Sequence, residues 1–224
     1  MLKIDVISVQ PRMFDGFLTE SIVSRAVAKG LCEVRVVDLR EYGVGRWRKV
    51  DERPYGGGPG MLMRCEPWFA AVEAVALPGA RVVMTTPSAP RFTQRDAEDL
   101  SRAGQVVFMC GHYEGFDARV RTLATDAFSV GDFVMTGGEI AAAAMADAVV
   151  RLIPGAIGAG PAATADESFG RDGLLEAPQY TQPREFRGMR VPDELLSGDH
   201  ARIAAWRRRE AMRITQEERP DLLK

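Results

Sequence analysis

Apolar and polar positions follow two different periods along the first 150 residues of the chain. Short runs rich in β-branched residues predict strands at residues 2–9, 32–39, 81–86, 106–110 and 126–130. Longer stretches with helical spacing predict helices at residues 14–29, 66–76, 93–102, 117–125 and 139–153. Because helices separate the strands, we predict an α/β fold with a parallel sheet and helices on both faces.

Two stretches lack this periodicity. Residues 40–60 end in YGGGPG and predict a long loop of the kind that often binds or covers a ligand. After Pro154 the chain becomes rich in Gly, Ala and Pro, which is typical of a linker. We therefore predict a first domain over residues 1–158, a linker over 159–175 and a polar, helical domain over 176–224.

Within the last domain, one helix has a clear start signal. Asp199 is expected to cap a helix over residues 200–214, and Ile203, Trp206 and Met212 suggest that this helix has one apolar side.

The turns that follow the strands are candidate ligand sites. In SVGDFVMTGGE, residues 129–139, an apolar strand runs into glycines, and Thr136 with Glu139 predicts a capping box that starts the next helix. CGHYEG, residues 110–115, has the same layout, and a third strand ends at residues 85–87. Ligands of open α/β sheets lie outside the carboxyl ends of strands, so these turns could face one ligand. Plain strand-to-helix turns are the alternative.

Charge changes this picture only locally. The formal net charge of −2, from 29 basic and 31 acidic residues, argues against a protein that coats nucleic acid by bulk charge. However, residues 40–53 hold five basic residues around Tyr42 and Trp47, and residues 202–213 hold five arginines around Trp206. Such patches can grip phosphates while an aromatic ring stacks on a base, although a solvated surface has the same composition.

Several classes of protein are disfavoured. The three cysteines are far apart and form no C-x-x-C, so we expect neither disulfides nor a zinc site but a reducing cytoplasm. No signal peptide or membrane-spanning run is expected. The motifs of Walker A loops, Rossmann dinucleotide sites, α/β-hydrolases and zinc proteases are missing, and only His112 and His200 are present. Carboxylates, arginines and glycine turns remain, which suits a nucleotide-like ligand.

Six motifs carry a resemblance to a known family. They are RPYGGGPGMLM (53–63), CGHYEG (110–115), SVGDFVMTGGE (129–139), RLIPG (151–155), GLLEAPQYTQP (173–183) and LLSGDHARIAAWR (195–207). In this order and spacing they resemble the bacterial tRNA (guanine-N1)-methyltransferase family, TrmD, over nearly the whole chain.

The resemblance implies a SPOUT-type parallel sheet with a C-terminal trefoil knot, a rare exception to the usual connection rules, plus a small helical C-terminal domain that binds tRNA. It implies a cytoplasmic homodimer with its active site at the subunit interface. The methyl donor would be S-adenosyl-L-methionine, and the target would be N1 of guanosine 37, directly 3′ of the anticodon (m1G37). Mg²⁺ is allowed as a further cofactor, but no residue pattern indicates a metal site.

The same resemblance assigns roles to residues. Guanine N1 carries a proton, so a base must remove it while a cation stabilises O6, and the matching residues are Asp166 and Arg151. Because the family acid directly precedes Ser-Phe whereas Glu167 intervenes here, Glu167 is the alternative base. His112 is a candidate for binding tRNA phosphate or guanine, with a plain surface histidine as the alternative, and Glu114 and Asp51 are candidate helpers for the target guanosine or a metal. The residues that match the donor site are Thr85, Thr86, Pro87, Gly111, Tyr113, Glu114, Val130, Gly131, Asp132, Phe133, Val134, Met135, Gly137 and Gly138.

Two other functions stay open from the sequence. A catalytically inactive RNA-binding protein on the same fold would explain the altered segment at residues 166–168. A nucleotide-binding hydrolase or kinase would have to act without a phosphate-binding loop.

Overall fold

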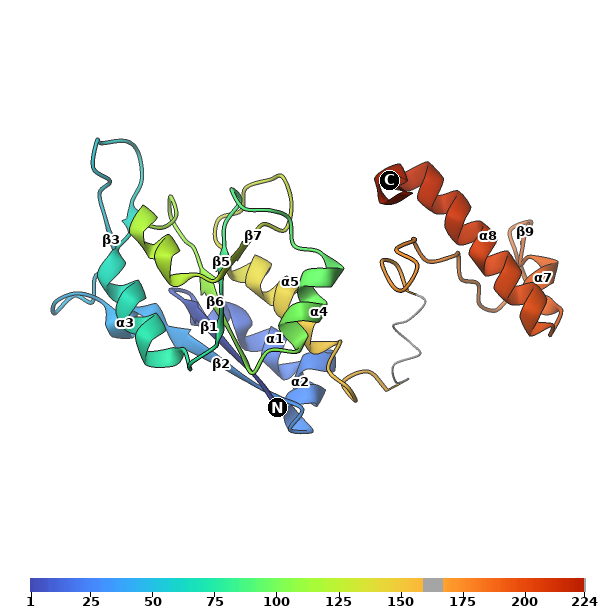
Figure 1. Ribbon diagram of the computed structural model, residues 1–224, viewed down its shortest axis with the longest axis horizontal. Helices are drawn as coiled ribbons and strands as arrows, with labels where there is room; N and C mark the ends of the chain where they lie inside the picture. Colours follow the sequence, from blue (N-terminus) through green and yellow to red (C-terminus); the bar gives the residue numbers. More distant parts are fainter. Residues whose placement is uncertain (159–166, 224) are drawn as a thin grey trace. The chain divides into compact units, whose positions relative to one another are not determined.

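A computed structural model describes residues 1–158 and 167–223 of the chain (Figure 1). The chain divides into two compact units, Met1–Gly158 and Ala159–Lys224, each of which is described by itself. The predicted linker therefore lies partly outside the described residues.

The first unit is built on a parallel sheet of five strands in the order β2-β1-β6-β5-β7. The strands are β1 (Leu2–Ser8), β2 (Cys32–Asp38), β5 (Arg81–Thr85), β6 (Gln105–Cys110) and β7 (Asp126–Phe128). Every residue of β6 is buried, as expected for a central strand covered on both faces. The predicted parallel α/β sheet is thus confirmed.

Alternate strand residues point into two separate hydrophobic cores. Val106 and Phe108 face a core that includes α2 (Ser21–Ala28), α4 (Gln94–Ser101) and α5 (Glu139–Val150). Val107 and Met109 face the other core, which includes α3 (Cys65–Val75). Figure 1 shows α3 on one side of the sheet and the other three helices on the opposite side. The prediction of helices on both faces is therefore confirmed.

Three predicted elements differ from the observed ones. Residues 11–28 form η1 (Pro11–Phe14), α1 (Asp15–Thr19) and α2 instead of one helix, because Glu20 is extended and Ser21 has a φ of 63°. The predicted helix at 117–125 is the 3-10 helix η3 (Ala118–Leu123), which Asp117 caps shortly before β7 begins. The long loop contains η2 (Leu39–Tyr42) and a ribbon of β3 (Asp51–Glu52) with β4 (Leu62–Met63).

The second unit consists of a small hairpin and helices. Its elements are β8 (Glu185–Phe186), β9 (Met189–Arg190), α7 (Asp193–Leu196), α8 (His200–Glu218) and η4 (Pro220–Leu223).

The helix predicted from Asp199 is α8. The Asp199 carboxylate accepts from the N–H groups of Ala201 at 2.9 Å and Arg202 at 3.1 Å, so the predicted cap is confirmed, and the helix runs four residues further than predicted. Trp206 is buried against Tyr180, but Met212 is 37% exposed, so the predicted apolar side is wrong at that position. Across the described residues, none of the helices has both the length and the apolar character needed to cross a membrane.

Candidate active site

The carboxyl ends of three neighbouring strands meet at one edge of the sheet. Strands β6, β5 and β7 lie side by side and end at Cys110, Thr85 and Phe128. The Thr85 hydroxyl donates to the Met109 carbonyl at 3.0 Å, and the Thr86 N–H donates to the Phe128 carbonyl at 3.1 Å. The predicted ligand-binding turns are therefore neighbours in space.

Glycines allow two of these turns to touch. The Gly138 N–H donates to the Gly111 carbonyl at 2.7 Å. A Cβ on Gly138 would lie 2.0 Å from the Thr85 hydroxyl oxygen and 2.9 Å from the Gly111 nitrogen. No residue with a side chain fits there without displacing its neighbours, so the backbones of the two loops approach closely only because residue 138 is glycine.

The residues predicted to hold a donor divide into a buried floor and an exposed rim. Thr85 and Gly138 are buried. The half-buried residues are Thr86, Gly111, Val130, Gly131, Met135 and Gly137. The exposed residues are Pro87, Tyr113, Glu114, Asp132, Phe133 and Val134. Thr85 is the last residue of β5, and the other thirteen belong to the turns that follow β5, β6 and β7, so one ligand could contact residues of all three turns.

The end of the long glycine-rich loop lies against the turn after β6. The Glu114 N–H donates to the Met61 carbonyl at 3.0 Å, and the Met63 N–H donates to the Gly115 carbonyl at 2.9 Å. Gly60 has a φ of 78°, and a Cβ there would lie 2.4 Å from a Glu114 carboxylate oxygen. This contact joins two motifs more than fifty positions apart. Asp51 pairs with Met63 in the ribbon of the same loop.

The predicted capping box at the start of α5 is wrong. The N-cap is Gly138, which offers no side-chain bond, and Thr136 is exposed outside the helix. Glu139 is instead buried with 2% of its surface exposed, and its carboxylate accepts from the Ser8 hydroxyl at 2.7 Å. The side chain of Glu139, which the local pattern predicts in a capping box, therefore bonds instead to Ser8 at the end of a distant strand.

Arg151 lies at the opposite end of α5 from these turns. It is the half-buried C-cap of the helix, and its N–H donates to the Asp147 carbonyl at 3.0 Å. From Gly138 to Arg151 the helix rises roughly 20 Å at about 1.5 Å per residue. An arginine side chain is too short to span that length, so Arg151 does not reach the turns at the start of the helix within its own chain.

Only one of the two candidate bases lies among the described residues. Asp166 lies outside the described residues. Glu167 is half-buried in the second unit, where it lines a cavity of about 740 Å³ together with Arg171, His200 and Arg207.

Two aspartates of the first unit are held by ion pairs with arginines. Two hydrogen bonds from the Arg119 guanidinium and one from its N–H hold the pKa of Asp117 far below its usual value. Arg81 pairs with Asp126 at the amino ends of β5 and β7 and lowers the pKa of that carboxyl. Burial raises the pKa of the Cys110 thiol well above its usual value, so this cysteine is not a nucleophile. Among the described residues, no three His, Cys, Asp or Glu side chains could hold a metal ion together.

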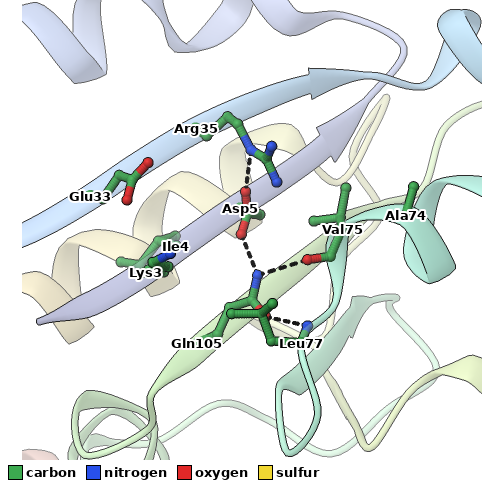
Figure 2. Close-up of a pocket in the computed structure, with 9 residues that line it drawn as sticks. All are labelled: Lys3, Ile4, Asp5, Glu33, Arg35, Ala74, Val75, Leu77 and Gln105. Carbon is green, nitrogen blue, oxygen red and sulfur yellow. Dashed lines mark hydrogen bonds and ion pairs between the residues drawn. The ribbon is translucent and has the colours of Figure 1, made fainter.

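A different cavity lies toward the amino ends of the strands. Its volume is about 270 Å³, and Figure 2 shows Asp5 between Arg35 and Gln105 within it. The Asp5 carboxylate accepts from Arg35 and Gln105 at 2.6 Å each, and Gln105 also bonds to the backbone of Val75 and Leu77. The side chains of Asp5, Arg35 and Gln105 therefore bond to other groups of the protein, and these bonds have a structural role.

No role was predicted for two residues whose side chains contact the candidate active site. Ser8 is an ordinary strand end, and the Met63 sulfur accepts from the His112 N–H at 3.2 Å. Ser8 belongs to no recognised motif, and Met63 ends the motif at residues 53–63 without a predicted role, since both contacts involve segments far along the chain.

Known proteins resemble the chain over almost its full length. The model of the family "tRNA (Guanine-1)-methyltransferase TrmD" matches residues 2–224. Proteins called tRNA (guanine-N(1)-)-methyltransferase are similar: the one from Citrifermentans bemidjiense is 53% identical, over 99% of this chain and 90% of its own. Those of Geobacter sulfurreducens and Geobacillus kaustophilus are 51% and 49% identical, over 99% of this chain and 91% of theirs. The chain belongs to the TrmD family of tRNA (guanine-1)-methyltransferases.

Proposed function

We propose that this protein transfers a methyl group from S-adenosyl-L-methionine to N1 of guanosine 37 in tRNA. The observation that carries the proposal is the meeting of the turns that follow β5, β6 and β7, of which the last two contain glycines, in a chain of this family. The donor would supply a methyl group on a positively charged sulfur.

The proposed donor site suits such a ligand. Backbone N–H and C=O groups at half-buried glycines can approach a flat base closely, and the exposed ring of Phe133 can cover it. The strand order supports a trefoil knot of the SPOUT type, because the chain passes from β5 to β6 and returns beyond β5 to β7.

The proposed chemistry assigns one task to each of two residues. Asp166 accepts the proton of guanine N1, and Arg151 stabilises the negative charge that develops on O6. Glu167 remains the alternative base. If Mg²⁺ takes part, one or two carboxylates with water would suffice, and Glu114 and Asp51 are the candidates.

We further propose a homodimer whose active sites combine both protomers. The length of α5 supports this arrangement, since Arg151 is too far from the donor turns of its own chain. Ile140 on the same helix is 60% exposed, and Val134 in the preceding turn is 82% exposed, so both offer apolar surface to a second copy.

The second unit would hold the tRNA, and the enzyme would act in the cytoplasm. Helix α8 carries five arginines over residues 202–213, whose contacts with phosphates could offset the few kcal/mol needed to flip the guanine out of its stack. We keep the predicted division into a donor-binding domain at 1–158, a linker at 159–175 and a tRNA-binding domain at 176–224.

One experiment tests the reaction. The purified protein is incubated with labelled S-adenosyl-L-methionine and a tRNA that has guanosine at position 37, and the nucleosides are analysed by mass spectrometry. We expect 1-methylguanosine, and none with a tRNA that has adenosine at 37. Unmodified tRNA despite tight binding would instead favour an RNA-binding protein without catalysis.

The choice of base is tested in single turnovers. Asp166→Ala is expected to abolish methyl transfer, whereas Glu167→Ala should retain it. Full activity of Asp166→Ala together with an inactive Glu167→Ala would move the role to Glu167.

A complementation test addresses the shared site. Gly131→Leu should block donor binding while preserving the fold, because the nearest obstacle to a side chain there is the exposed ring of Phe133. Arg151→Ala should also be inactive, because it lacks the cation proposed to stabilise the charge on O6. Co-expressed with separate tags, the two variants should regain roughly one quarter of the activity, because half of the dimers are mixed and each keeps one intact site. If the mixture is as inactive as each variant alone, Arg151 and the donor belong to the same protomer.

A further inference from the structure

Glu139 is a buried acid that the proposed reaction does not use. One carboxylate oxygen accepts from the Ser8 hydroxyl at 2.7 Å. The other has no hydrogen-bond partner and lies 3.7 Å from Nδ1 of His112, which is itself buried and unpartnered. A buried carboxylate is costly unless its oxygens are satisfied, so this pair of facing atoms needs an explanation.

The three residues join three elements of the candidate active site. Ser8 ends β1, His112 lies in the turn after β6, and Glu139 begins α5, where the helix dipole favours a carboxylate. Gly137 lies directly beside the facing atoms: a Cβ there would be 2.3 Å from the Glu139 oxygen and 2.7 Å from Nδ1 of His112. The glycine therefore leaves the space in which the two side chains can meet.

The imidazole of His112 has one inward and one outward edge. Its Nδ1 is buried, yet the side chain as a whole is 22% exposed, so the accessible edge is the one that carries Nε2. The neighbouring ring of Tyr113 meets it edge to face, with the ring centroids 5.0 Å apart. Tyr113 belongs to the proposed donor site, so the orientation of His112 affects the wall of that site.

We propose that Glu139 is a positioning residue that holds His112 with a proton on Nδ1 turned inward, and thereby fixes the turn at residues 110–115 against residues 137–138. A proton on Nδ1 satisfies both buried atoms with one N–H···O bond after a small rotation of either side chain. The opposite tautomer would set the Nδ1 lone pair against a carboxylate oxygen. The proposal rests on the proposed function for its effect on the donor, but not for the state of the ring.

The ring state can be observed directly, because the chain has only two histidines. Nitrogen NMR of protein labelled with ¹⁵N-histidine should show two imidazoles, and His200→Gln assigns them. We expect a proton on Nδ1 of His112 in the unaltered protein and a shift toward Nε2 in Glu139→Gln. A bare Nδ1 in the unaltered protein, or an unchanged ring in Glu139→Gln, overturns the proposal.

Donor binding supplies the second readout. By calorimetry, Glu139→Gln is expected to weaken S-adenosyl-L-methionine binding about tenfold, the effect of one charge-assisted hydrogen bond. His112→Asn places an amide N–H near the position of Nδ1 and should bind the donor better than His112→Gln. The double variant Glu139→Gln with His112→Gln should bind the donor no more weakly than the weaker-binding of the two single variants, since both substitutions break the same contact.

The outcomes separate the two proposals. Additive losses in the double variant, or donor binding by Glu139→Gln equal to that of the unaltered protein, would refute the positioning role. If the unaltered protein fails to methylate tRNA, the proposed function fails, whereas the NMR result still decides the state of His112.

Discussion

The contact between Gly138 and the turn after β6 makes a sharp prediction for Gly138→Ala. The added methyl group would lie 2.0 Å from the Thr85 hydroxyl oxygen and 2.9 Å from the Gly111 nitrogen. Thr85 has little freedom to move, because it is 4% exposed and its hydroxyl donates to the Met109 carbonyl. The backbone of Gly111 is also held, since its carbonyl accepts from the Gly138 N–H at 2.7 Å.

These constraints set the expected magnitude. Forcing one extra carbon into a packed interior costs about 1–3 kcal/mol, and displacing the Thr85 hydroxyl costs about 1 kcal/mol within that range. The midpoint of thermal unfolding should fall by roughly 2–4 °C for each kcal/mol. Because the overlap separates two donor turns, the affinity for S-adenosyl-L-methionine should also fall by about tenfold.

Gly104→Ala is the matched control. Gly104 precedes β6 at the amino end of the strand, has an ordinary φ and has no atom within 4 Å of an added Cβ. Its replacement should leave donor binding unchanged and stability within about 1 kcal/mol of the original. Adding Thr85→Ala to Gly138→Ala should restore part of the lost stability, because the closest overlap is removed. If Gly138→Ala has the same unfolding midpoint and the same donor affinity as the unaltered protein, the close packing of the turns is refuted.

Three further predictions concern charge, thiol reactivity and the second unit. Asp126→Asn should lower stability at neutral pH by about 1–2 kcal/mol, as judged by denaturant unfolding, because it breaks a half-buried pair with Arg81. Arg81 lowers the pKa of Asp126 in the folded state, so the contribution is full above the ordinary aspartate pKa and is lost as the pH falls through the lower folded value; the difference between variant and original should vanish in acid. Cys110 should resist iodoacetamide in the native protein and react only after unfolding, as read by mass spectrometry. Trp206→Ala should destabilise the second unit by about 3–5 kcal/mol, whereas Met212→Ala, at a more exposed position of the same helix, should have little effect on the same unfolding curve.

The positions of the strands and their parallel pairing could be predicted, although their order in the sheet was not, and the clearest signal comes from β6, which is covered on both faces. Burial on both faces produces continuous apolar runs such as residues 106–110, and these runs are visible without any tertiary information. The break between α1 and α2 was not visible, since Ser21 adopts a positive φ that its residue type does not signal. Strand positions therefore follow from composition, whereas helix breaks depend on the packing of the whole unit.

The place of the candidate active site could also be predicted, but its internal contacts could not. Parallel strands bring their carboxyl ends to one edge, so the glycine turns after β6 and β7 lie at the same edge, on either side of the end of β5. The same local reasoning failed at Glu139, where the sequence fits a capping box but the side chain turns to Ser8, 131 positions away. A cap contributes about 1 kcal/mol on the surface, and a charge-assisted bond between a buried strand residue and a buried helix residue outweighs it.

Helix α5 explains why sequence neighbours need not act in one site. It begins at Glu139, among the donor turns, and ends where Arg151 begins the next motif. A continuous helix holds its two ends apart, and the small residues of its buried side, Ala141, Ala142 and Ala146, belong to the core on that face of the sheet. In the proposed reaction the donor and the arginine must nevertheless meet at one guanine. That requirement is met when the far end of α5 from one protomer approaches the donor turns of another, so the length of this helix favours an enzyme that functions only as a dimer.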